Sequence, residues 1–582
     1  MKTLVENLIR EALDAIAPAD TDLSFIDIAV ERTRDPAHGH FASNIAMQLA
    51  KPLRNAPRKI AEEITAALGD NELIERVEIA GPGFINFHLT PAALHAELLQ
   101  ILASGDRYGE SNAGQNQKVI LEYVSANPTG PLHVGHGRHA AFGACVANLL
   151  KAAGFEVHQE YYVNDAGRQM DILALSTWLR LLELAGHNIT FPAGGYKGQY
   201  VKEIAEELGQ TNPELKELPD GLFNDLPQDG PDGNTDAHLD ALINNMRGLL
   251  GDDVFLLVLN TALDNILGDI RDDLGEFGVH FDEWFSERSL TDNGDVDKAL
   301  KVLADNNVTY EKEGAIWFRA TDYDDEKDRV VVRDNGRTTY FASDIAYHLN
   351  KTNRGFDKIV DIWGSDHHGY IPRVRAGMEA MQQPSEKLEV DLVQFVVLYR
   401  GGEKAQMSTR SGEFITLREL REEVGNDAAR LFFVMRANEQ HLEFDLDLAK
   451  SKTNENPVYY LQYAHARICS VMRELEPKGY SYSESIGKQS LALLTAEQES
   501  ALTVRLTQFP EMVELAARQR APQHIVHYLK EVAQEFHTWY NACRFIEEDA
   551  ALRNARLFLA LQTKQVLANG LGLLGVTAPE EM

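Results

Sequence analysis

The feature that most constrains the fold is an apolar run that leads through a glycine-rich turn into an alanine-rich run. The first run, KVILEYVS, begins at residue 118, and the alanine-rich run covers residues 139–153. A second apolar run, GFEVHQEYYVN, follows at residues 154–164. This strand–helix–strand order, within roughly 45 residues, predicts a parallel βαβ unit of the doubly wound kind.

The length of the chain predicts several domains. It has 582 residues and a mass of 65.0 kDa, which is too much for one hydrophobic core. A hydrophobic fraction of 44% with 25% charged residues is typical of a soluble globular protein. No run reaches the roughly 18 apolar residues that a membrane helix needs, so we expect no association with a membrane.

The cysteines and the N-terminal run indicate the cytoplasm. Cys145, Cys469 and Cys543 are far apart and odd in number, which predicts no disulfide framework and no cysteine-based zinc site. The first residues, MKTLVENLIREALDAI, place apolar residues on one helical face with acids between them. A signal peptide would instead be uniformly apolar behind a basic start.

The net charge of −33 argues against a protein that coats nucleic acid nonspecifically. A specific RNA partner could still bind a local basic patch. One candidate patch is KPLRNAPRK at residues 51–59, which contains Arg54 and Arg58. The alternative is a solvated basic face that balances an acidic neighbour.

Changes in pattern divide the chain into four predicted parts. They are an α+β unit at 1–108, a Rossmann-like part at 118–385 with an insertion at about 190–250, a connecting part at 386–445, and an all-α helical bundle at 446–582. The polar stretch 106–117 is the expected linker after the first part. The Pro-, Gly- and Asp-rich stretch 209–238 is expected on the surface.

Shorter patterns predict individual elements. In the first part, Phe41, Ile45 and Leu49 recur every fourth residue, as in a helix, and ERVEIAGPGFINFHL predicts strand, turn and strand. The stretch RVVVRDNGRTTYF predicts a hairpin, and KIVDIWGSDHHG predicts a strand that ends in a polar turn. In the bundle, PQHIVHYLKEVAQEFHTWY places apolar residues on one helical stripe.

The turn after the first strand is a candidate phosphate cradle. His133 and His136 lie where the strand ends and the helix begins, and ligands of open α/β sheets bind at this edge. We expect free N–H groups and the helix dipole to favour an anion there, and the two imidazoles to donate hydrogen bonds to phosphate oxygens. The glycines are expected to let a ligand approach the backbone; they are Gly130, Gly135, Gly137 and Gly143.

Two other interpretations of this turn remain open. One is a glycine-rich surface turn with exposed histidines. The other is a metal site, because His133, His136 and His139 are spaced by three residues. The metal interpretation is weaker, since no acidic residue lies in the cluster and the spacing is not a standard zinc pattern.

The same turn carries a family resemblance. HVGH resembles the HxGH signature of class I aminoacyl-tRNA synthetases and related nucleotidyl transferases, and the longer string EYVSANPTGPLHVGHGRHAAFG resembles bacterial arginyl-tRNA synthetases. This resemblance implies a Rossmann-like catalytic domain in which His133, Gly135 and His136 are catalytic. It also implies ATP contacts from Asn127, Pro128, Thr129, Gly130, Pro131, Leu132, Val134 and Gly137.

A second family signature, KMSKS, is matched in part by KAQMSTRSG at residues 404–412. The resemblance implies catalytic roles for Lys404, Met407, Ser408 and Arg410. The stretch departs from the pattern at Gln406 and Thr409, where lysines are expected. Lys404 and Arg410 are the nearest cations that could stabilise the ATP phosphates, and which one does so is left open. A polar surface loop is the alternative.

The resemblance also implies an arginine pocket. A guanidinium needs planar carboxylate acceptors and aromatic or amide partners. The matching residues are Glu122, Ser125, Asn127, His136, Tyr340, Asp344 and His367. Tyr340 and Asp344 are four residues apart, so at a helix start they would face the same way. The alternative for Asp344 is an acid favoured by the helix dipole.

Other family strings extend the resemblance over nearly the whole chain. GSDHHGY implies a floor for the nucleotide, formed by Gly364, Asp366, His367 and His368, although its side chains could also suggest a metal site. The N-terminal part resembles a domain that contacts the outer corner of tRNA, and the bundle resembles an anticodon-binding domain. The candidate tRNA contacts are Arg54, Arg58, Tyr459, Tyr463 and Arg467, for which surface exposure or core packing is the alternative.

These resemblances imply an arginine–tRNA ligase. It would join arginine to ATP as an adenylate and then transfer arginine to the 3′ end of tRNA(Arg), with bound tRNA required for the first step. We expect Mg²⁺ with the ATP, no protein-bound zinc, and a monomer. The rival hypotheses are an HxGH nucleotidyltransferase, a catalytically silent tRNA-binding relative, and a histidine-based metallohydrolase.

Overall fold

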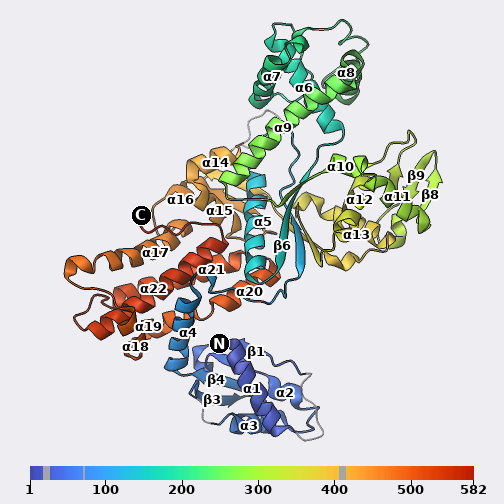
Figure 1. The fold of residues 1–582 in the computed structure, drawn as a ribbon. Coiled ribbons are helices and arrows are strands. Elements are labelled where there is room, and N and C mark those ends of the chain that lie inside the picture. Colours follow the sequence, from blue (N-terminus) through green and yellow to red (C-terminus); the bar gives the residue numbers. More distant parts are fainter. Residues whose placement is uncertain (18–25, 34, 70–71, 406–414) are drawn as a thin grey trace.

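The structure is a computed structural model of the chain (Figure 1). It describes residues 1–17, 26–33, 35–69, 72–405 and 415–582. None of the helices in these ranges is long and apolar enough to cross a membrane.

A five-stranded parallel sheet lies at the centre of the molecule. Its order is β12-β11-β5-β6-β7. The strands are β5 (Lys118–Glu122), β6 (Glu156–Val163), β7 (Glu283–Ser286), β11 (Lys358–Gly364) and β12 (Leu388–Val393). The chain runs outward from β5 to β7 and then returns to pair β11 with the other side of β5. The strand order therefore reverses between β5 and β11, which is the point where doubly wound sheets bind ligands.

The predicted βαβ unit is confirmed. β5 leads through the glycine-rich turn into α5 (Val134–Ala152), and β6 then pairs with β5 in parallel. The helix starts earlier than the alanine-rich run indicates, because His133 caps it. It is buried on most of its surface, since it lies between the sheet and helices from the C-terminal part.

The insertion between β6 and β7 is helical and projects from one end of the molecule (Figure 1). It contains α6 (Arg168–Leu184), α7 (Gln199–Thr211), α8 (Thr235–Leu250) and α9 (Asp252–Glu276). The stretch 209–238 lies mostly on the surface, as its composition predicts. Leu215 and Leu222 are exceptions, because both are buried against the neighbouring helices.

A second group of elements lies between β7 and β11. It comprises α10 (Glu287–Asp292), α11 (Asp295–Asp305), the antiparallel strands β8 (Thr309–Lys312), β9 (Ala315–Phe318) and β10 (Arg329–Val332), and α12 (Tyr340–Asn353). The hairpin predicted after β10 is reduced to a single bridge between Val332 and Thr338, because α12 begins two residues later. After β11, α13 (Ile371–Ala380) crosses to β12.

The N-terminal part forms a separate sheet with helices on it, at the bottom of Figure 1. The order β1-β2-β4-β3 is antiparallel. Its elements are α1 (Lys2–Ile16), β1 (Val30–Arg32), β2 (Phe41–Ser43), α2 (Ile45–Leu49), α3 (Pro57–Leu68), β3 (Ile74–Ala80) and β4 (Phe84–Leu89). The predicted strand–turn–strand is confirmed, but the prediction of one helix through Phe41, Ile45 and Leu49 is wrong at Phe41. That residue pairs with Phe87 in the sheet, and all three side chains face the same small core.

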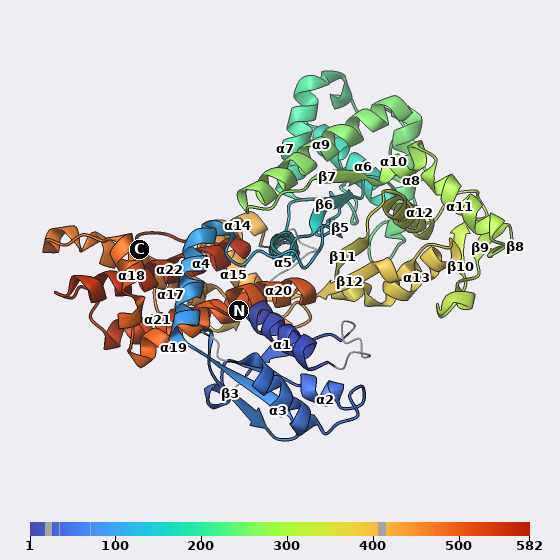
Figure 2. The ribbon, with the colours of Figure 1, turned by 60° about the horizontal axis from the view of Figure 1, so that its bottom comes forward.

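Helix α4 (Pro91–Ser104) joins this part to the rest of the chain. Leu94 packs in the N-terminal core, whereas Leu98 and Ile101 pack in the main core. Figure 2 shows α4 running beside helices of the C-terminal part. The helix therefore belongs to both cores, and the boundary at residue 108 stays a prediction.

The C-terminal part is helical, and beyond Asp445 the chain contains no strand. Its longer helices are α17 (Pro457–Arg473), α19 (Glu497–Leu506), α20 (Phe509–Gln519), α21 (Gln523–Ala542) and α22 (Ala550–Leu573), with the short α18 (Glu484–Gln489) beside α22. The apolar stripe predicted for α21 is confirmed, because Ile525, Leu529, Val532, Phe536 and Trp539 are all fully buried.

The connecting part contains β13 (Val396–Arg400), β14 (Glu403–Lys404), β15 (Leu442–Asp445), α14 (Leu417–Val424) and α15 (Asn426–Val434), and α16 (Leu446–Lys450) follows it directly. Arg138 of α5 holds this part against the sheet. Its guanidinium is 1% exposed and donates to four carbonyl oxygens, at 2.7 Å to Gln394, 2.8 Å to Gln440, 2.9 Å to Ala437 and 3.4 Å to Phe433. Burial lowers the pKa of Arg138 to about 10, so it remains charged at neutral pH.

Replacing Arg138 by Met should destabilise the connecting part strongly. The variant leaves buried carbonyl groups without a donor, which should cost about 3 kcal/mol of unfolding free energy. Thermal unfolding and limited proteolysis would measure the loss. The matched control is Arg58→Met, because Arg58 is 61% exposed and should change stability by less than about 0.5 kcal/mol. Equal stability of the two variants would contradict this role of Arg138.

Candidate functional site

The candidate site lies at the carboxyl edge of the central sheet, where β5 and β11 lie side by side. Glu122 ends β5 and pairs in register with Asp361 of β11, which continues to Gly364. The two sequence stretches singled out for ligand binding, 122–143 and 364–370, therefore meet at one edge. This is the position that the sheet topology favours for a ligand.

His133 and His136 form a reciprocal cap at the start of α5. The Nδ1 atom of His133 accepts hydrogen bonds from the backbone N–H groups of Gly135 at 3.0 Å and His136 at 3.4 Å. In return, the Nδ1 atom of His136 accepts from the backbone N–H of His133 at 3.3 Å. The two rings stack with centroids 3.6 Å apart and planes 17° apart. The side chains thus replace the usual Ser or Thr and Glu of a capping box.

This cap determines the tautomer of both rings. A backbone N–H can only donate, so each Nδ1 must keep its lone pair, and a neutral ring then carries its proton on Nε2. Burial lowers the pKa of His133, and burial together with the neighbouring His133 and His139 lowers the pKa of His136 well below its usual value. At neutral pH both rings are therefore uncharged, with the proton on Nε2.

The expectation of free backbone N–H groups at this turn is wrong. Val134 donates to the carbonyl of Ile415, Gly137 donates to the carbonyl of His133, and the two N–H groups between them are capped by His133. These four backbone N–H groups are therefore already paired within the protein.

The chain just after the second predicted signature, from residue 415 on, lies beside the first signature. Leu417 donates to the carbonyl of Leu132 at 2.8 Å, and Thr416 forms a bridge with His133. Lys404 is exposed on β14. The predicted residues Met407, Ser408 and Arg410 lie outside the described residues, so their roles stay predictions.

The glycines of the turn are explained by packing within the protein. A Cβ at Gly143 would lie 2.2 Å from the ring of Tyr123, and one at Gly137 would lie 2.7 Å from Leu417. The expectation that these two glycines clear space for a ligand is therefore wrong. Packing also limits the other two glycines, since a Cβ would lie 2.8 Å from the His133 ring at Gly135 and 3.1 Å from Tyr200 at Gly130.

The predicted ATP-binding residues of this turn are divided between core and surface. Leu132 and Val134 are each 1% exposed, so only their backbone atoms could contact a nucleotide. Asn127 is exposed, and its Oδ1 accepts from Asn164 at 2.9 Å.

The predicted nucleotide floor after β11 lies on the surface. Gly364 ends β11 beside exposed residues, and the Asp366 and His367 side chains are 61% and 62% exposed. His368 is also exposed.

The loop after β5 is strained. Val124 and Ser125 have φ angles of 69° and 39°, in the left-handed region that such residues rarely adopt. Ser125 is held there because its hydroxyl donates to Glu122 at 3.0 Å and accepts from the backbone N–H of Tyr162 at 3.1 Å. Strain of this kind clusters at functional sites.

The predicted guanidinium partners lie at the start of α12. Tyr340 is its first residue and is 54% exposed, with its hydroxyl near Gly167. Asp344, one turn later, accepts a hydrogen bond from the hydroxyl of Tyr370. Burial raises the pKa of Asp344, although Tyr370 and His348 oppose the rise. Both residues lie in the first two turns of α12, but Tyr340 is exposed whereas Asp344 is half-buried against Tyr370, so a common direction of the two side chains stays a prediction.

Glu287 is a candidate that the sequence patterns missed. It is the first residue of α10, is 6% exposed, and its Oε2 atom has no hydrogen-bond partner among the described residues. Burial, and then the charges of Asp344 and Asp165, raise its pKa to about 7. A buried carboxylate oxygen without a hydrogen-bond partner, with the Asp344 and Asp165 carboxylates nearby, favours binding of a cation. The available signal was that Glu287 directly follows β7, at the same sheet edge as Glu122.

Glu122 is 7% exposed and takes part in a buried ion network. Its Oε2 atom contacts the ammonium of Lys351 at 2.5 Å, and Lys351 also contacts Asp361 at 2.7 Å. Burial raises the pKa of Glu122, while Lys351 opposes the rise. Lys351 and Asp361 were not predicted as site residues.

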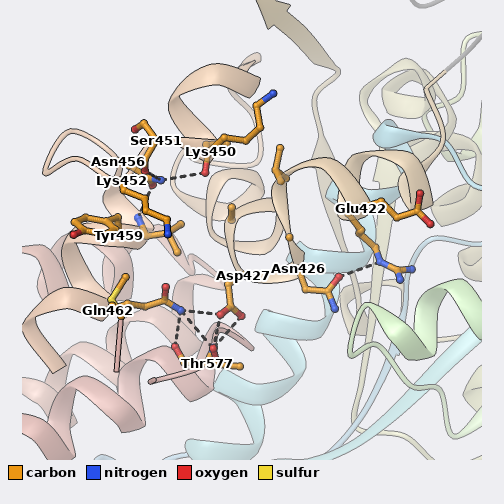
Figure 3. A pocket seen from close by; sticks show the side chains of 17 residues that line it. Glu422, Asn426, Asp427, Lys450, Ser451, Lys452, Asn456, Tyr459, Gln462 and Thr577 are labelled. Carbon is orange, nitrogen blue, oxygen red and sulfur yellow. Dashed lines mark hydrogen bonds between the residues drawn. The ribbon is translucent and has the colours of Figure 1, made fainter. Parts of the chain in front are cut away.

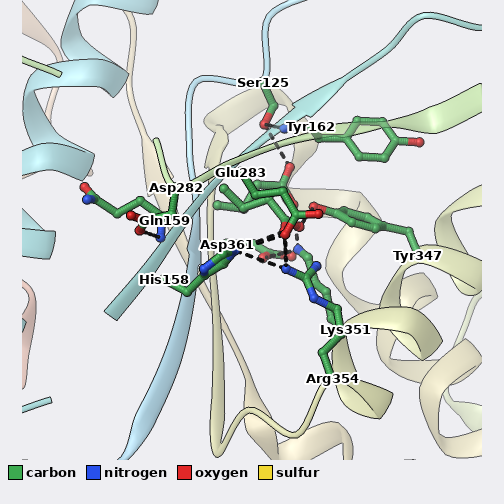
Figure 4. A network of polar contacts seen from close by, with 12 residues as sticks. Ser125, His158, Gln159, Tyr162, Asp282, Glu283, Tyr347, Lys351, Arg354 and Asp361 are labelled. Carbon is green, nitrogen blue, oxygen red and sulfur yellow. Dashed lines mark hydrogen bonds and ion pairs between the residues drawn. The ribbon is translucent and has the colours of Figure 1, made fainter. Parts of the chain in front are cut away.

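One group of side chains among the described residues has the geometry of a metal site. His158, Glu160 and Glu283 bring their ligand atoms within 4.8 Å of one another. Arg354 already contacts these carboxylates, at 2.6 Å to Glu160 and 2.7 Å to Glu283 (Figure 4). The guanidinium therefore balances their charge.

The predicted RNA-contact residues of the bundle lie on one face of α17. Tyr459 and Tyr463 stack with centroids 5.6 Å apart, and Arg467 lies over the rings of Tyr463 and Tyr540 at 4.5 and 4.6 Å. All of them are partly exposed, which favours a surface role over core packing. Trp539, in contrast, is fully buried.

Tyr459 also lines a hollow of about 590 Å³ between the connecting part and the bundle. Figure 3 shows Lys450, Lys452 and Asn456 on its wall beside Tyr459. At its floor, the Asp427 carboxylate accepts from Gln462 at 2.7 Å. The hollow therefore offers an aromatic ring, amides and cations, which are the groups that bind unpaired nucleotides.

The two arginines predicted to contact RNA lie in the N-terminal part. Arg54 has a φ of 49° in the turn before α3, and Arg58 lies in the first turn of that helix. The guanidinium of Arg58 is 3.7 Å from Glu62. An exposed ion pair of this kind contributes little to stability, so it does not keep Arg58 from a partner. Both arginines are exposed and therefore accessible.

Comparison with protein families gives matches over almost the whole chain. Residues 3–89 match the arginyl tRNA synthetase N terminal domain. Residues 97–187 and 272–454 match the catalytic domain of class I (R) tRNA synthetases. Residues 461–582 match the DALR anticodon binding domain. The gap in the second match covers α7, α8 and most of α9 of the helical insertion.

Individual relatives agree with these matches. The arginine–tRNA ligase of Thioalkalivibrio sulfidiphilus is 55% identical and that of Coxiella burnetii is 51% identical, each over the full length of both chains. A solved structure from Campylobacter jejuni, described as an arginyl t-RNA synthetase, has a TM-score of 0.73 and 32% identity, and covers 85% of this chain and all of that one. The Thermus thermophilus arginyl-tRNA synthetase shares the fold over the full length of both chains, with a TM-score of 0.72 and 23% identity.

The cap at His133 predicts a difference between two substitutions. His133→Ala removes the acceptor for two N–H groups, so hydrogen exchange in the first turn of α5 should speed up by about fivefold, the equivalent of about 1 kcal/mol. His133→Asn keeps an acceptor oxygen near the Nδ1 position and should exchange within about twofold of the unaltered chain. Hydrogen–deuterium exchange of a peptide that covers 134–140 measures both. Identical exchange in the two variants would show that His133 does not cap the helix.

Proposed function

The chain belongs to the arginyl-tRNA synthetase family, and from this premise we propose that the carboxyl edge of β5 and β11 is its catalytic site. The protein is an arginine–tRNA ligase, which uses ATP to activate arginine and then transfers it to tRNA. The observation that carries the placement is the stacked pair of His133 and His136 at the point where the strand order reverses. The steps below assign the reaction to residues at that edge.

In the first step, a carboxylate oxygen of arginine attacks the α-phosphorus of ATP. The bond from that phosphorus to the bridging oxygen breaks, and pyrophosphate leaves. No general base is needed, because the nucleophile is already ionised. Catalysis must come from alignment and from stabilisation of the charge on the phosphate oxygens. The Nε2–H groups of His133 and His136 are suited to this, since their other nitrogens are occupied by the helix cap.

ATP binds as its Mg²⁺ complex in this proposal. The loop from Asn127 to Pro131 and the turn from Gly364 to His368 flank the nucleotide from the two strands. Lys404 and Arg410 are the proposed cations for the leaving pyrophosphate. We assign no resident metal, and the absence of protein-bound zinc, the monomeric state and the cytoplasmic location stay predictions.

Arginine lies between two sets of carboxylates in this proposal. Asp344 and Glu287 accept the guanidinium, and Tyr340 covers it from the surface. Glu122, Ser125 and Asn127 hold the amino-acid end, near the histidines and His367. A lysine ammonium could not satisfy two planar carboxylates in the same way, so discrimination between the two amino acids should be steep.

In the second step, a ribose hydroxyl at the 3′ end of tRNA attacks the carbonyl carbon of the adenylate, and AMP leaves. Arg54 and Arg58 are proposed to contact the outer corner of the tRNA. The stacked tyrosines of α17, with Arg467, are proposed to contact the anticodon loop, and the adjoining hollow offers space for unpaired bases. The need for bound tRNA in the first step is an expectation from the family.

The rival hypotheses are less well supported. The match to an anticodon binding domain over residues 461–582 argues against a nucleotidyltransferase that lacks such a domain. ATP–pyrophosphate exchange tests the proposal directly. Exchange should require arginine and tRNA(Arg) together. No exchange, with retained tRNA binding, would instead identify a silent relative.

His136→Ala should slow arginine-dependent ATP–pyrophosphate exchange by about 10²–10³-fold, because one donor to the developing phosphate charge is lost. The affinity for tRNA(Arg), measured by filter binding, should stay within about twofold, because the proposed contacts to the corner and anticodon loop of the tRNA are made by other parts of the chain. Loss of tRNA binding with unchanged exchange would contradict the placement.

His133→Asn provides the matched variant for this test. It keeps an acceptor for the helix cap and lacks the Nε2–H donor, so exchange should slow although the first turn of α5 stays protected. Exchange at the unaltered rate would show that the imidazole donor is not used.

Arginine binding should depend on pH through Glu287. Its pKa of about 7 in the arginine-free protein means that it is largely protonated at pH 6 and must lose a proton to accept the guanidinium. The KM for arginine should therefore rise as pH falls below about 7, by up to tenfold per pH unit, whereas the KM for ATP should not.

The control is Glu287→Gln, which should have a raised KM for arginine with this pH dependence removed. Asp344→Ala should likewise raise the KM for arginine and leave that for ATP almost unchanged. A KM for arginine that is flat between pH 5.5 and 8 in the unaltered chain would remove Glu287 from the pocket.

A further inference from the structure

Lys351 occupies an unusual position for a lysine in the last turn of a helix. It is 0% exposed, although α12 ends only two residues later. Its ammonium contacts Glu122 at 2.5 Å and Asp361 at 2.7 Å, which lie opposite each other on β5 and β11 (Figure 4). It therefore joins the two strands between which the strand order reverses.

The same face of α12 carries further polar contacts. Tyr347 donates to Glu160 of β6 at 2.6 Å, and the Nε2 atom of His348 lies 3.1 Å from Asp361. Asp344 begins this face. Asp344, Tyr347 and His348 precede Lys351 by seven, four and three residues, and these spacings place all four side chains on one side of the helix. One rigid helix thus brings a carboxylate to the proposed guanidinium position and a cation to Glu122.

The charge of Glu122 depends on this cation. Burial raises the pKa of Glu122, and Lys351 is the largest influence that lowers it. Burial alone would lower the pKa of Lys351, but the charges of Asp361 and Glu122 outweigh that effect and raise it. The charged and titratable groups around Glu122 are Lys351 and Tyr347 from α12, Asp361 from β11, and Glu160 and Tyr162 from β6.

We propose that Lys351 is a positioning residue for arginine activation, because it holds the Glu122 carboxylate charged and at a fixed distance from Asp344. This inference rests on the proposed function, in which these carboxylates receive the two ends of arginine. Lys351 does not touch the substrate in this proposal, since it is 0% exposed and both of its contacts are with protein carboxylates. Its removal acts through Glu122: an unpaired buried carboxylate takes up a proton and no longer attracts the α-ammonium group.

Lys351→Met tests the proposal in ATP–pyrophosphate exchange with the full chain and tRNA(Arg). The KM for arginine should rise by at least about tenfold, with the KM for ATP within about twofold. The KM for arginine should also fall as pH rises from 7 to 8.5, because Glu122 must now be deprotonated by the solution. In the unaltered chain the change over this range should be no more than about twofold, because Glu287, with a pKa of about 7, is already half ionised at pH 7.

The matched control is Arg354→Met. Arg354 directly follows the last residue of α12 and belongs to the same network, but contacts Glu160 and Glu283 instead of Glu122. It should lower thermal stability, and the KM for arginine should stay within about twofold. A purely structural role of Lys351 predicts that both variants change the KM for arginine alike.

A double variant separates positioning from folding. Glu122→Gln combined with Lys351→Met should have the same KM for arginine as Glu122→Gln alone, because the lysine acts through that carboxylate. If Lys351→Met does not fold, Lys351→Arg keeps the charge in a different geometry and should raise the KM for arginine without the pH dependence.

An unchanged KM for arginine, an equal rise for ATP, or additive effects in the double variant would each overturn the proposal. Failure of the unaltered chain to charge tRNA(Arg) with arginine would overturn the proposed function instead. The two failures are distinguishable, because the second concerns the unaltered chain.

Discussion

The parallel pairing of β5 with β11 is the constraint on which the rest of the site depends. Because the chain leaves the sheet on one side of β5 and returns on the other, the connections diverge and leave an opening at the carboxyl edge. The two histidines, the strained loop and the GSDHHGY turn all border that opening. Lys351 joins the two strands at this boundary through its contacts to Glu122 and Asp361.

The start of α5 shows how backbone and side-chain chemistry are divided. The N–H groups that a helix N-terminus normally offers an anion are used by His133 and by Ile415. In the proposed catalytic site, phosphate contacts would come from imidazole Nε2 atoms instead. Because the same hydrogen bonds fix the tautomer, such donors would be preorganised, which is the condition for effective charge stabilisation.

Local patterns predicted much of the fold, and their errors have physical causes. Alternation and turn residues located β3 and β4, and the apolar stripe of α21 was fully confirmed. Phe41 was misassigned because a spacing of four also suits a strand followed by a short helix when all the side chains enter one core. Gly137 and Gly143 were interpreted as space for a ligand, since the sequence does not show that Leu417 and Tyr123 pack against them.

The amino-acid sequence by itself determined the order of elements, the histidine signature and the family to which it points, because these depend on residues close together in the chain. Tertiary structure alone decided which charges meet. A lysine in a last helical turn normally faces water, yet Lys351 is buried against a carboxylate 229 residues away in sequence. Glu287 similarly acquires its raised pKa from burial and from Asp344, which packing brings near it. These contacts depend on long-range packing, so no local periodicity in the sequence predicts them.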